Sequence, residues 1–163
     1  MSDGRILVAE QDGVYVLKFL GDVRLTLCPS LDQYLDNALQ SRHFRSVLID
    51  LTETQGIDST SLGILAKLSV RMRKQVQRVP TLVSINNNIT RILLSMGFDK
   101  VFTLVSKLDA DLPPCDQLEN ANCSEQEMQD KVLEAHKTLM GLNDKNQQEF
   151  KSLVDALESQ CQI

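Results

Sequence analysis

The sequence predicts an α/β fold, in which helices pack on a mixed sheet of four to five strands and a C-terminal α-helical hairpin follows. Three observations support this class. Two apolar-rich runs, at residues 5–10 and 14–20, flank a Gly-containing turn and are typical of paired antiparallel strands. Strand-like and helix-like patterns then alternate, as they do where crossover helices join parallel strands. A capping-box pattern at residue 124 opens a separate helical region.

The elements of the first 108 residues follow in order after this strand pair. Pro29 stands where a first helical turn tolerates proline, and apolar residues at helical spacing extend from Leu31 to Leu39. Residues 46–51 are apolar without polar alternation, which indicates a strand covered on both faces. The remaining expected elements are a helix over about 59–78, a strand over 80–85, a helix between Asn88 and Gly97, and a strand over 101–105.

The chain is expected to divide into a domain at residues 1–108, a linker at 109–123 and a helical hairpin extension at 124–163. Pro113-Pro114 supports the linker, because consecutive prolines block helix and strand alike. Charge also divides at this boundary. Residues 1–108 hold 13 Lys and Arg against 10 Asp and Glu, whereas residues 109–163 hold 4 against 12. The asymmetry indicates two segments with different roles.

The hairpin prediction rests on two amphipathic stretches. Ser124 and Glu127 have the spacing of a capping box, and the apolar residues that follow predict a helix from about 124 to 140. Gly141 offers a stop before a second apolar face that begins at Phe150. Three roles stay open: the acidic hairpin folds back on a basic helix and competes with a partner, it pairs with a second copy in a homodimer, or it covers a sheet edge.

Composition disfavours several functional classes. The chain has no run of about 18 apolar residues and no signal-peptide pattern, so we expect a cytoplasmic protein without a membrane partner. A net charge of −5 with 4% aromatic residues disfavours nucleic-acid binding. Its four cysteines stand far apart, which predicts reduced thiols and no metal site. His43 and His136 neighbour no residues at catalytic spacing, so we expect no enzyme, no catalytic residue and no cofactor.

The segment Ile57-Asp58-Ser59-Thr60-Ser61-Leu62-Gly63 follows a buried strand and opens the long helix. Unpaired backbone N–H groups and the helix dipole favour negative charge at such a position, which would suit a phosphate. Asp, Ser and Thr are also the residues preferred as plain helix caps, and spacing alone favours that simpler interpretation. Further along this helix, Lys67, Arg71, Lys74 and Arg78 form a basic stripe, which is more often a solvated face than a docking surface.

Residues 1 to about 108 resemble a STAS domain of the bacterial anti-sigma-factor antagonists. The resemblance rests on Val47-Leu48-Ile49-Asp50-Leu51 followed by the segment from Ile57 to Gly63. It implies phosphorylation of Thr60, with the preceding Ser59 as the runner-up. Ser61 departs from the family pattern, which often has Gly or Ala there. The residues expected to contact a partner are Asp58, Ser61, Leu62, Gly63, Lys67 and Arg71.

The resemblance also implies a partner-switching cycle. In this family the unphosphorylated antagonist binds an anti-sigma factor, which is often the kinase itself, and thereby frees a sigma factor. Phosphorylation breaks the complex and a phosphatase resets it. The alternative is a STAS-like accessory subunit that docks on a transporter or another signalling protein without being phosphorylated. The two hypotheses need the same fold and differ in whether Thr60 and Ser59 are modified.

Overall fold

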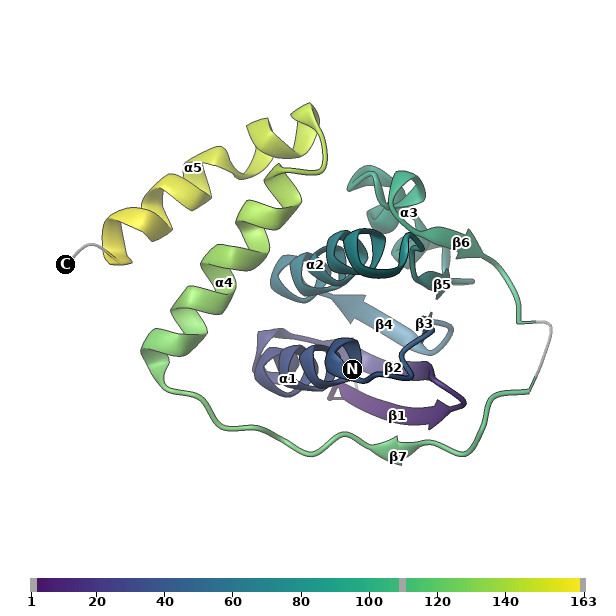
Figure 1. Cartoon of the computed structure of the whole chain (residues 1–163). Helices are drawn as coiled ribbons and strands as arrows, with labels where there is room; N and C mark the ends of the chain where they lie inside the picture. Colours follow the sequence, from purple (N-terminus) through teal and green to yellow (C-terminus); the bar gives the residue numbers. More distant parts are fainter. Residues whose placement is uncertain (1–2, 109–110, 162–163) are drawn as a thin grey trace.

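The computed structural model of this chain describes residues 3–108 and 111–161, with a mixed sheet at its centre (Figure 1). The strand order is β6-β5-β3-β2-β1-β7, with β4 paired to the end of β2. The strands are β1 (Arg5–Gln11), β2 (Val14–Val23), β3 (Ser46–Asp50), β4 (Thr54–Ile57), β5 (Thr81–Val83), β6 (Thr103–Val105) and β7 (Asp116–Gln117). β1 lies antiparallel to β2 and β7, whereas β2, β3, β5 and β6 are parallel neighbours. The predicted α/β class is confirmed.

The first two strands pair through a tight turn. Asp12 and Gly13 have φ angles of 52° and 85°, the left-handed conformations that suit a two-residue hairpin turn. Such a turn matches the twist of the strands, so β1 and β2 pair in register from Arg5 opposite Leu20 to Gln11 opposite Val14. β3 lies between β2 and β5, in the central position expected for residues 46–51.

The described residues form a sheet of seven strands, where four to five were predicted. β4 has the sequence Thr-Gln-Gly-Ile, which lacks apolar alternation, and Thr54 Oγ1 ties it to the sheet by donating to Phe19 O at 2.8 Å. β7 has only two residues and lies inside the linker predicted at 109–123, where Leu118 N donates to Ile6 O at 2.8 Å. Both strands are formed by long-range pairing, which leaves no periodic signal in the sequence.

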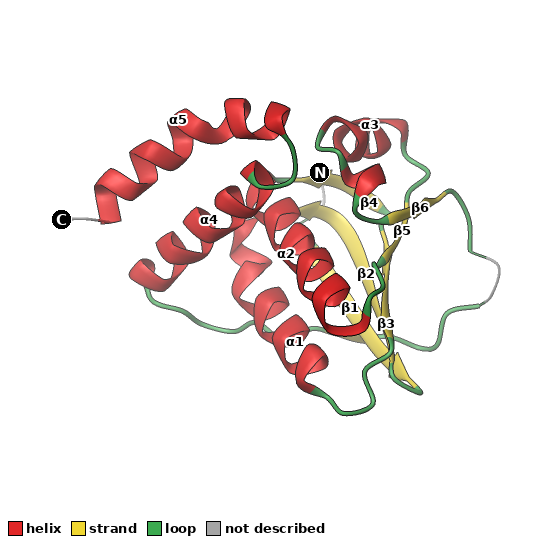
Figure 2. Ribbon diagram, turned by 45° about the horizontal axis from the view of Figure 1, so that its top comes forward, coloured by secondary structure: helices red, strands yellow, loops and turns green. Residues whose placement is uncertain are grey.

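Helices α1 and α2 lie against one face of the sheet (Figure 2). The main core fills the space between these helices and the sheet. Phe19, Ile49 and Leu65 are among its fully buried side chains. The helices are α1 (Cys28–Gln40), α2 (Ser59–Val76), α3 (Asn87–Ser95), α4 (Glu125–Met140) and α5 (Asp144–Cys161), with 3-10 turns η1 (Leu25–Leu27) and η2 (Phe98–Lys100). The α2 and α3 starts agree with the predicted caps to within about two residues.

The predicted C-terminal hairpin is present as α4 and α5. Ser124 caps α4 with the reciprocal Glu127 contact of a capping box, as its sequence predicted. α4 does not stand apart from the first domain: it crosses the beginning of α2 (Figure 1), and Ala135 and Leu139 belong to the main core. The apolar stripe of α4 is therefore covered by the chain itself.

Candidate functional site

Asp58 caps α2 and also holds the loop before α1. Its Oδ1 accepts a hydrogen bond from Ser61 N at 2.9 Å, and its Oδ2 accepts one from Leu25 N at 2.7 Å. The Asp58 backbone is extended, with φ −86° and ψ 168°, which is the usual geometry of an N-cap. Both carboxylate oxygens thus have structural roles, and they fix the three hydroxyl residues that follow in the first turn of α2.

The three hydroxyl residues occupy different environments. Ser59 is half-buried, whereas Thr60 is only 4% exposed. Ser61 is fully buried, and its Oγ lies 3.5 Å from Cys28 Sγ. Burial raises the pKa of the Cys28 thiol to about 12, so this pair stays neutral at physiological pH. Ser59 therefore has the least buried of the three side chains, and Ser61 contributes to the packing between α1 and α2.

His136 of α4 forms a hydrogen bond with Ser59 that joins the first turn of α2 to the hairpin. Ser59 Oγ lies 2.8 Å from His136 Nε2, and His136 Nδ1 lies 2.7 Å from Val132 O. In the neutral imidazole, Nδ1–H donates to this carbonyl, so Nε2 accepts from the Ser59 hydroxyl. The ring is 3% exposed and packs against Phe150, with ring centroids 5.5 Å apart.

A serine beside a histidine is also the beginning of a nucleophile–base pair. In catalytic triads a carboxylate orients the histidine and stabilises the imidazolium that forms during the reaction. Here the group behind the ring is the uncharged carbonyl of Val132, which orients His136 without offering that stabilisation. The arrangement is suited to holding α4 on α2 rather than to activating Ser59.

Gly63 of α2 lies in close contact with Ala135 of α4. A Cβ built on Gly63 would lie 2.6 Å from the carbonyl carbon and the Cβ of Ala135, and closer still to its carbonyl oxygen. Only glycine leaves room for this contact, because carbon atoms ordinarily stay about 3.5–4.0 Å apart. Leu62, the preceding residue, is buried in the core. Both residues were predicted to contact a partner, and here α4 covers Gly63.

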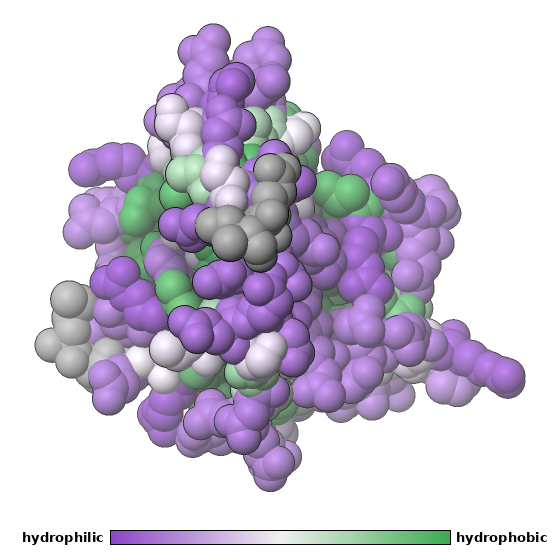
Figure 3. Space-filling model, turned by 90° about the vertical axis from the view of Figure 1, so that its left-hand side faces the viewer, coloured by the Kyte–Doolittle hydropathy of each residue, from purple (hydrophilic) through white to green (hydrophobic). Residues whose placement is uncertain are grey.

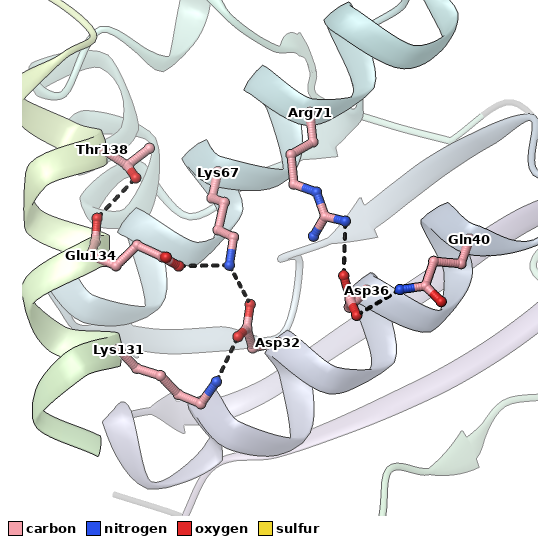
Figure 4. A network of polar contacts seen from close by, with 8 residues as sticks. All are labelled: Asp32, Asp36, Gln40, Lys67, Arg71, Lys131, Glu134 and Thr138. Atoms are coloured by element: carbon pink, nitrogen blue, oxygen red, sulfur yellow. Dashed lines mark hydrogen bonds and ion pairs between the residues drawn. The ribbon is translucent and has the colours of Figure 1, made fainter. Parts of the chain in front are cut away.

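Lys67 and Arg71 of the basic stripe are paired with carboxylates of the chain itself (Figure 4). Lys67 Nζ lies 2.6 Å from Glu134 Oε1 and 3.3 Å from Asp32 Oδ1, and Lys131 Nζ lies 2.7 Å from Asp32 Oδ2. Arg71 pairs with Asp36 at 2.8 Å. Among the described residues, the ion pair that joins the acidic hairpin to the basic stripe is that of Lys67 with Glu134. Lys74 and Arg78 are exposed further along.

These contacts shift the pKa values of Asp32 and Lys67, which lie at the centre of the network. Burial alone would raise the pKa of Asp32, yet the hydrogen bond from Lys131 and the charge of Lys67 hold that pKa below its usual range. Burial alone would lower the pKa of Lys67, yet the hydrogen bond to Glu134 and the charge of Asp32 raise it. Both groups therefore stay charged near neutral pH, and their attraction to each other and to Glu134 and Lys131 favours a closed arrangement of α1, α2 and α4.

The turn between α4 and α5, together with the first residues of α5, docks on the C-terminal end of α3. Asn143 Nδ2 and Asn146 Nδ2 donate to Met96 O at 3.3 and 2.9 Å, and Lys145 Nζ donates to Ser95 O at 3.0 Å. Carbonyl groups at a helix C-terminus lack intrahelical partners, so these donors satisfy them. The hairpin is thus held on α1 through Lys131, on the first half of α2 and at the end of α3.

The outer surface of the hairpin is mostly hydrophilic, with hydrophobic residues in small separate patches (Figure 3). Leu153 of α5 is 42% exposed, whereas Val154 beside it is buried. Among the described residues, none of the helices combines the length and apolar character that crossing a membrane requires. The same part of the chain holds no group of three or more His, Cys, Asp or Glu side chains placed to bind a metal ion.

Sequence reasoning placed every expected site residue on α2 or at its cap and missed what lies against them. His136 was set aside because no sequence neighbour suggested a role, and its contact with Ser59 spans 77 positions. The charge asymmetry between the two segments did point to a contact of the hairpin with the basic helix. Ala135 stands in the predicted apolar stripe of α4, so its inward direction could be foreseen, but its position opposite Gly63 could not.

Comparisons with known proteins agree with this architecture. The sequence model of the STAS domain matches residues 5–111. The chain is similar to the crystal structure of an anti-sigma factor antagonist from Mycobacterium paratuberculosis, with 26% identity and a TM-score of 0.57 over 66% of this chain and 89% of that one. It is also similar to a proposed anti-sigma factor antagonist from Thermotoga maritima, with 18% identity and a TM-score of 0.55 over 62% of this chain and 86% of that one. The second likeness supports the fold alone, and α4 and α5 lie beyond the residues that the sequence model matches.

Proposed function

The chain belongs to the family of proteins with a STAS domain, and on that premise we propose that it is an anti-sigma-factor antagonist. It acts in the cytoplasm as a binding protein without catalytic activity of its own. The likeness to the Mycobacterium paratuberculosis antagonist supports this function. The observation that carries it is the run of Asp58, Ser59 and Thr60 at the start of α2, where the hydroxyl residues fall within one capped helical turn.

Phosphorylation in this turn controls the affinity for the partner. Asp58 already contributes one negative charge, and a phosphate adds about −1.5 to −2 at neutral pH. The helix start tolerates that charge, because the first backbone N–H groups of α2 have no intrahelical acceptor. A partner that matches the unmodified surface then meets a strongly acidic one. The partners are an anti-sigma factor that is also a serine kinase, and a phosphatase that restores the unmodified form.

The acceptor is Thr60 or Ser59. Thr60 stands at the position that matches the family pattern, but its side chain is 4% exposed. Ser59 is less buried, yet its hydroxyl is bonded to His136. Either residue must become more accessible before a kinase can transfer a phosphoryl group to it. Coverage of both hydroxyls is the one observation that favours the alternative, an accessory subunit that docks on a transporter or signalling protein without being phosphorylated.

Intact-mass and fragment mass spectrometry of the protein from its native host, with and without phosphatase treatment, tests the proposal. A phosphate on Thr60 or Ser59 is expected. The variants Thr60→Asp and Ser59→Asp should then lose the anti-sigma factor in a pull-down that the wild type supports, and Ser152→Asp, a matched change on the exposed side of α5, should keep it. An unmodified chain under several growth conditions, together with unaltered binding by the Asp variants, would instead support the accessory subunit.

A homodimer through the C-terminal helices stays a second proposal. The apolar stripe of α4 is occupied by α2, so within the described part of the hairpin Leu153 on α5 is the large exposed hydrophobic residue that such a dimer would bury. Light scattering after size exclusion at two protein concentrations should show a mass that rises with concentration in the wild type and not in Leu153→Lys. A concentration-independent monomer mass for the wild type would refute the dimer.

A further inference from the structure

Three residues on one face of α2 contact the hairpin. Ser59, Gly63 and Lys67 are spaced four residues apart, so they share one face of α2. The opposing residues are consecutive on α4: His136 bonds Ser59, Ala135 packs on Gly63 and Glu134 pairs with Lys67. A single turn of α4 thus covers the first two turns of α2, the region that carries the proposed phosphorylation site.

This contact and a bound partner exclude each other. A protein that binds the first turn of α2 needs the space that α4 fills. A phosphoryl group on Ser59 also needs that space, because Ser59 Oγ is already 2.8 Å from His136 Nε2. Docking of a partner and modification of Ser59 therefore both require α4 to leave.

The contact has the chemistry of an exchangeable interface. Two of its three pairs are polar, Ser59 with His136 and Lys67 with Glu134, and the third joins two of the smallest residues. Interfaces between moving parts of one chain are generally more polar than permanent ones. Leu139 adds a buried apolar side chain to the core beside them. Lys67 also keeps Asp32 as a neighbour at 3.3 Å, so its charge has a partner when α4 leaves.

We propose that α4 is a built-in competitor for the docking surface of this antagonist, and that the partner occupies the same surface with a helix of the same chemistry. That helix presents a small residue to Gly63, an acidic residue to Lys67 and a hydrogen-bonding side chain to Ser59. The proposal rests on the proposed function, since it names the surface and the partner chemistry of the same site. The chain then has a closed form, a partner-bound form and a phosphorylated form, and α4 lies on α2 only in the first.

A pair of matched variants of the full chain tests the competition. Ala135→Gln places a longer side chain against Gly63 while keeping a good helix former, and Ala156→Gln makes the same change on the exposed side of α5. A fluorescent peptide of residues 124–142 is the probe for the vacated surface. It should bind the Ala135→Gln chain at least about tenfold more tightly than the wild type or Ala156→Gln, because the chain's own α4 no longer fills the surface. The peptide that itself carries Ala135→Gln should not bind.

Access to Ser59 gives a second readout. Ser59→Cys is introduced into a chain in which Cys115, Cys123 and Cys161 are Ser, and its reaction with a thiol reagent is timed. Adding Ala135→Gln should speed labelling by about tenfold or more, and adding Ala156→Gln should leave it unchanged. Circular dichroism confirms that each variant is folded. Equal labelling rates, or failure of the wild-type peptide to bind the Ala135→Gln chain, would overturn the competitor.

These outcomes are separable from failure of the proposed function, because neither readout requires an anti-sigma factor or a phosphate. If mass spectrometry and pull-down support the antagonist, that anti-sigma factor is titrated against the wild type and Ala135→Gln. We expect at least about tenfold tighter binding to Ala135→Gln. Equal affinities would reject α4 as a competitor and leave the antagonist function standing.

Discussion

Replacing Gly63 by Ala gives the sharpest test of how closely α4 is fitted to α2. The new Cβ would lie 2.6 Å from two carbon atoms of Ala135. Carbon atoms in contact ordinarily stay about 3.5–4.0 Å apart, so α4 has to retreat by about 1 Å. Such a shift takes the 2.8 Å contact between Ser59 Oγ and His136 Nε2 out of hydrogen-bonding range.

The expected cost follows from opposing contributions. Overpacking typically costs about 1–3 kcal/mol, and the lost hydrogen bond adds about 0.5–1.5 kcal/mol. Ala is a better helix former than Gly by about 1 kcal/mol, which offsets part of this within α2. We therefore expect Gly63→Ala to lower the free energy of unfolding by about 1–3 kcal/mol, with a fall in Tm of about 2–4 °C for each kcal/mol.

Urea denaturation measures this change, and hydrogen exchange measured on peptides of α4 locates it. Gly141→Ala is the matched control, because Gly141 has φ −73° and a Cβ there would lie 3.5 Å from Thr138 O, an ordinary van der Waals distance. It should stabilise the chain by up to about 1 kcal/mol. If Gly63→Ala were as stable as Gly141→Ala, with exchange in α4 unchanged, the close contact would be refuted.

Three further changes test other parts of the site. Asp58→Ala removes the acceptor of two backbone donors and should cost about 1–3 kcal/mol in urea denaturation, whereas Asp58→Asn, which keeps one side-chain oxygen, should cost less. The pKa of Asp32 is lower in the folded chain than its value near 3.8 in the unfolded chain, so Asp32 stabilises the fold above about pH 4 and this stabilisation is lost as the pH falls through the folded pKa. Asp32→Asn should therefore lose less stability between about pH 5 and pH 3 than the wild type. An identical pH profile would contradict this. The pKa of Cys28 is raised to about 12, so as the pH rises from about 9 the thiol ionises in the unfolded chain before it does in the folded one, and the fold becomes less stable. In Cys28→Ala the free energy of unfolding should therefore decline less steeply with pH. Equal slopes would argue against a buried neutral thiol.

The start of α2 could be predicted because its signals are local. A buried strand, a polar loop and Asp58 as a cap stand within a few residues of one another, and the structure confirms the helix from Ser59. The same holds for α4, whose capping box at Ser124 fixes its first residue. In both cases side chains bond to backbone groups of their own turn, so short spacing in the sequence carries the information.

The environment of the site could not be predicted, because it depends on contacts between distant segments. Lys67 was expected to contact a partner, and its pairing with Asp32 and Glu134 within the chain could not be foreseen. Those pairs depend on how α1 and α4 are placed, which no helical period reveals. Ser59 and Ser61, two positions apart, likewise look alike in the sequence, yet the hydroxyl of Ser59 contacts His136 and that of Ser61 contacts the Cys28 thiol.

The short strand β7 determines how far α4 can travel. With β7 paired and Leu118 bonded to Ile6, at most residues 119–124 connect the sheet to α4. This connecting segment spans about 20 Å when fully extended. Without that pairing the connecting segment would begin after β6 and include residues 106–124. Local concentration falls roughly as the −3/2 power of the length of a connecting segment, so the longer segment would lower the local concentration of α4 at its docking surface about sixfold. A two-residue strand on the outer edge of the sheet thus determines how quickly the molecule can close again.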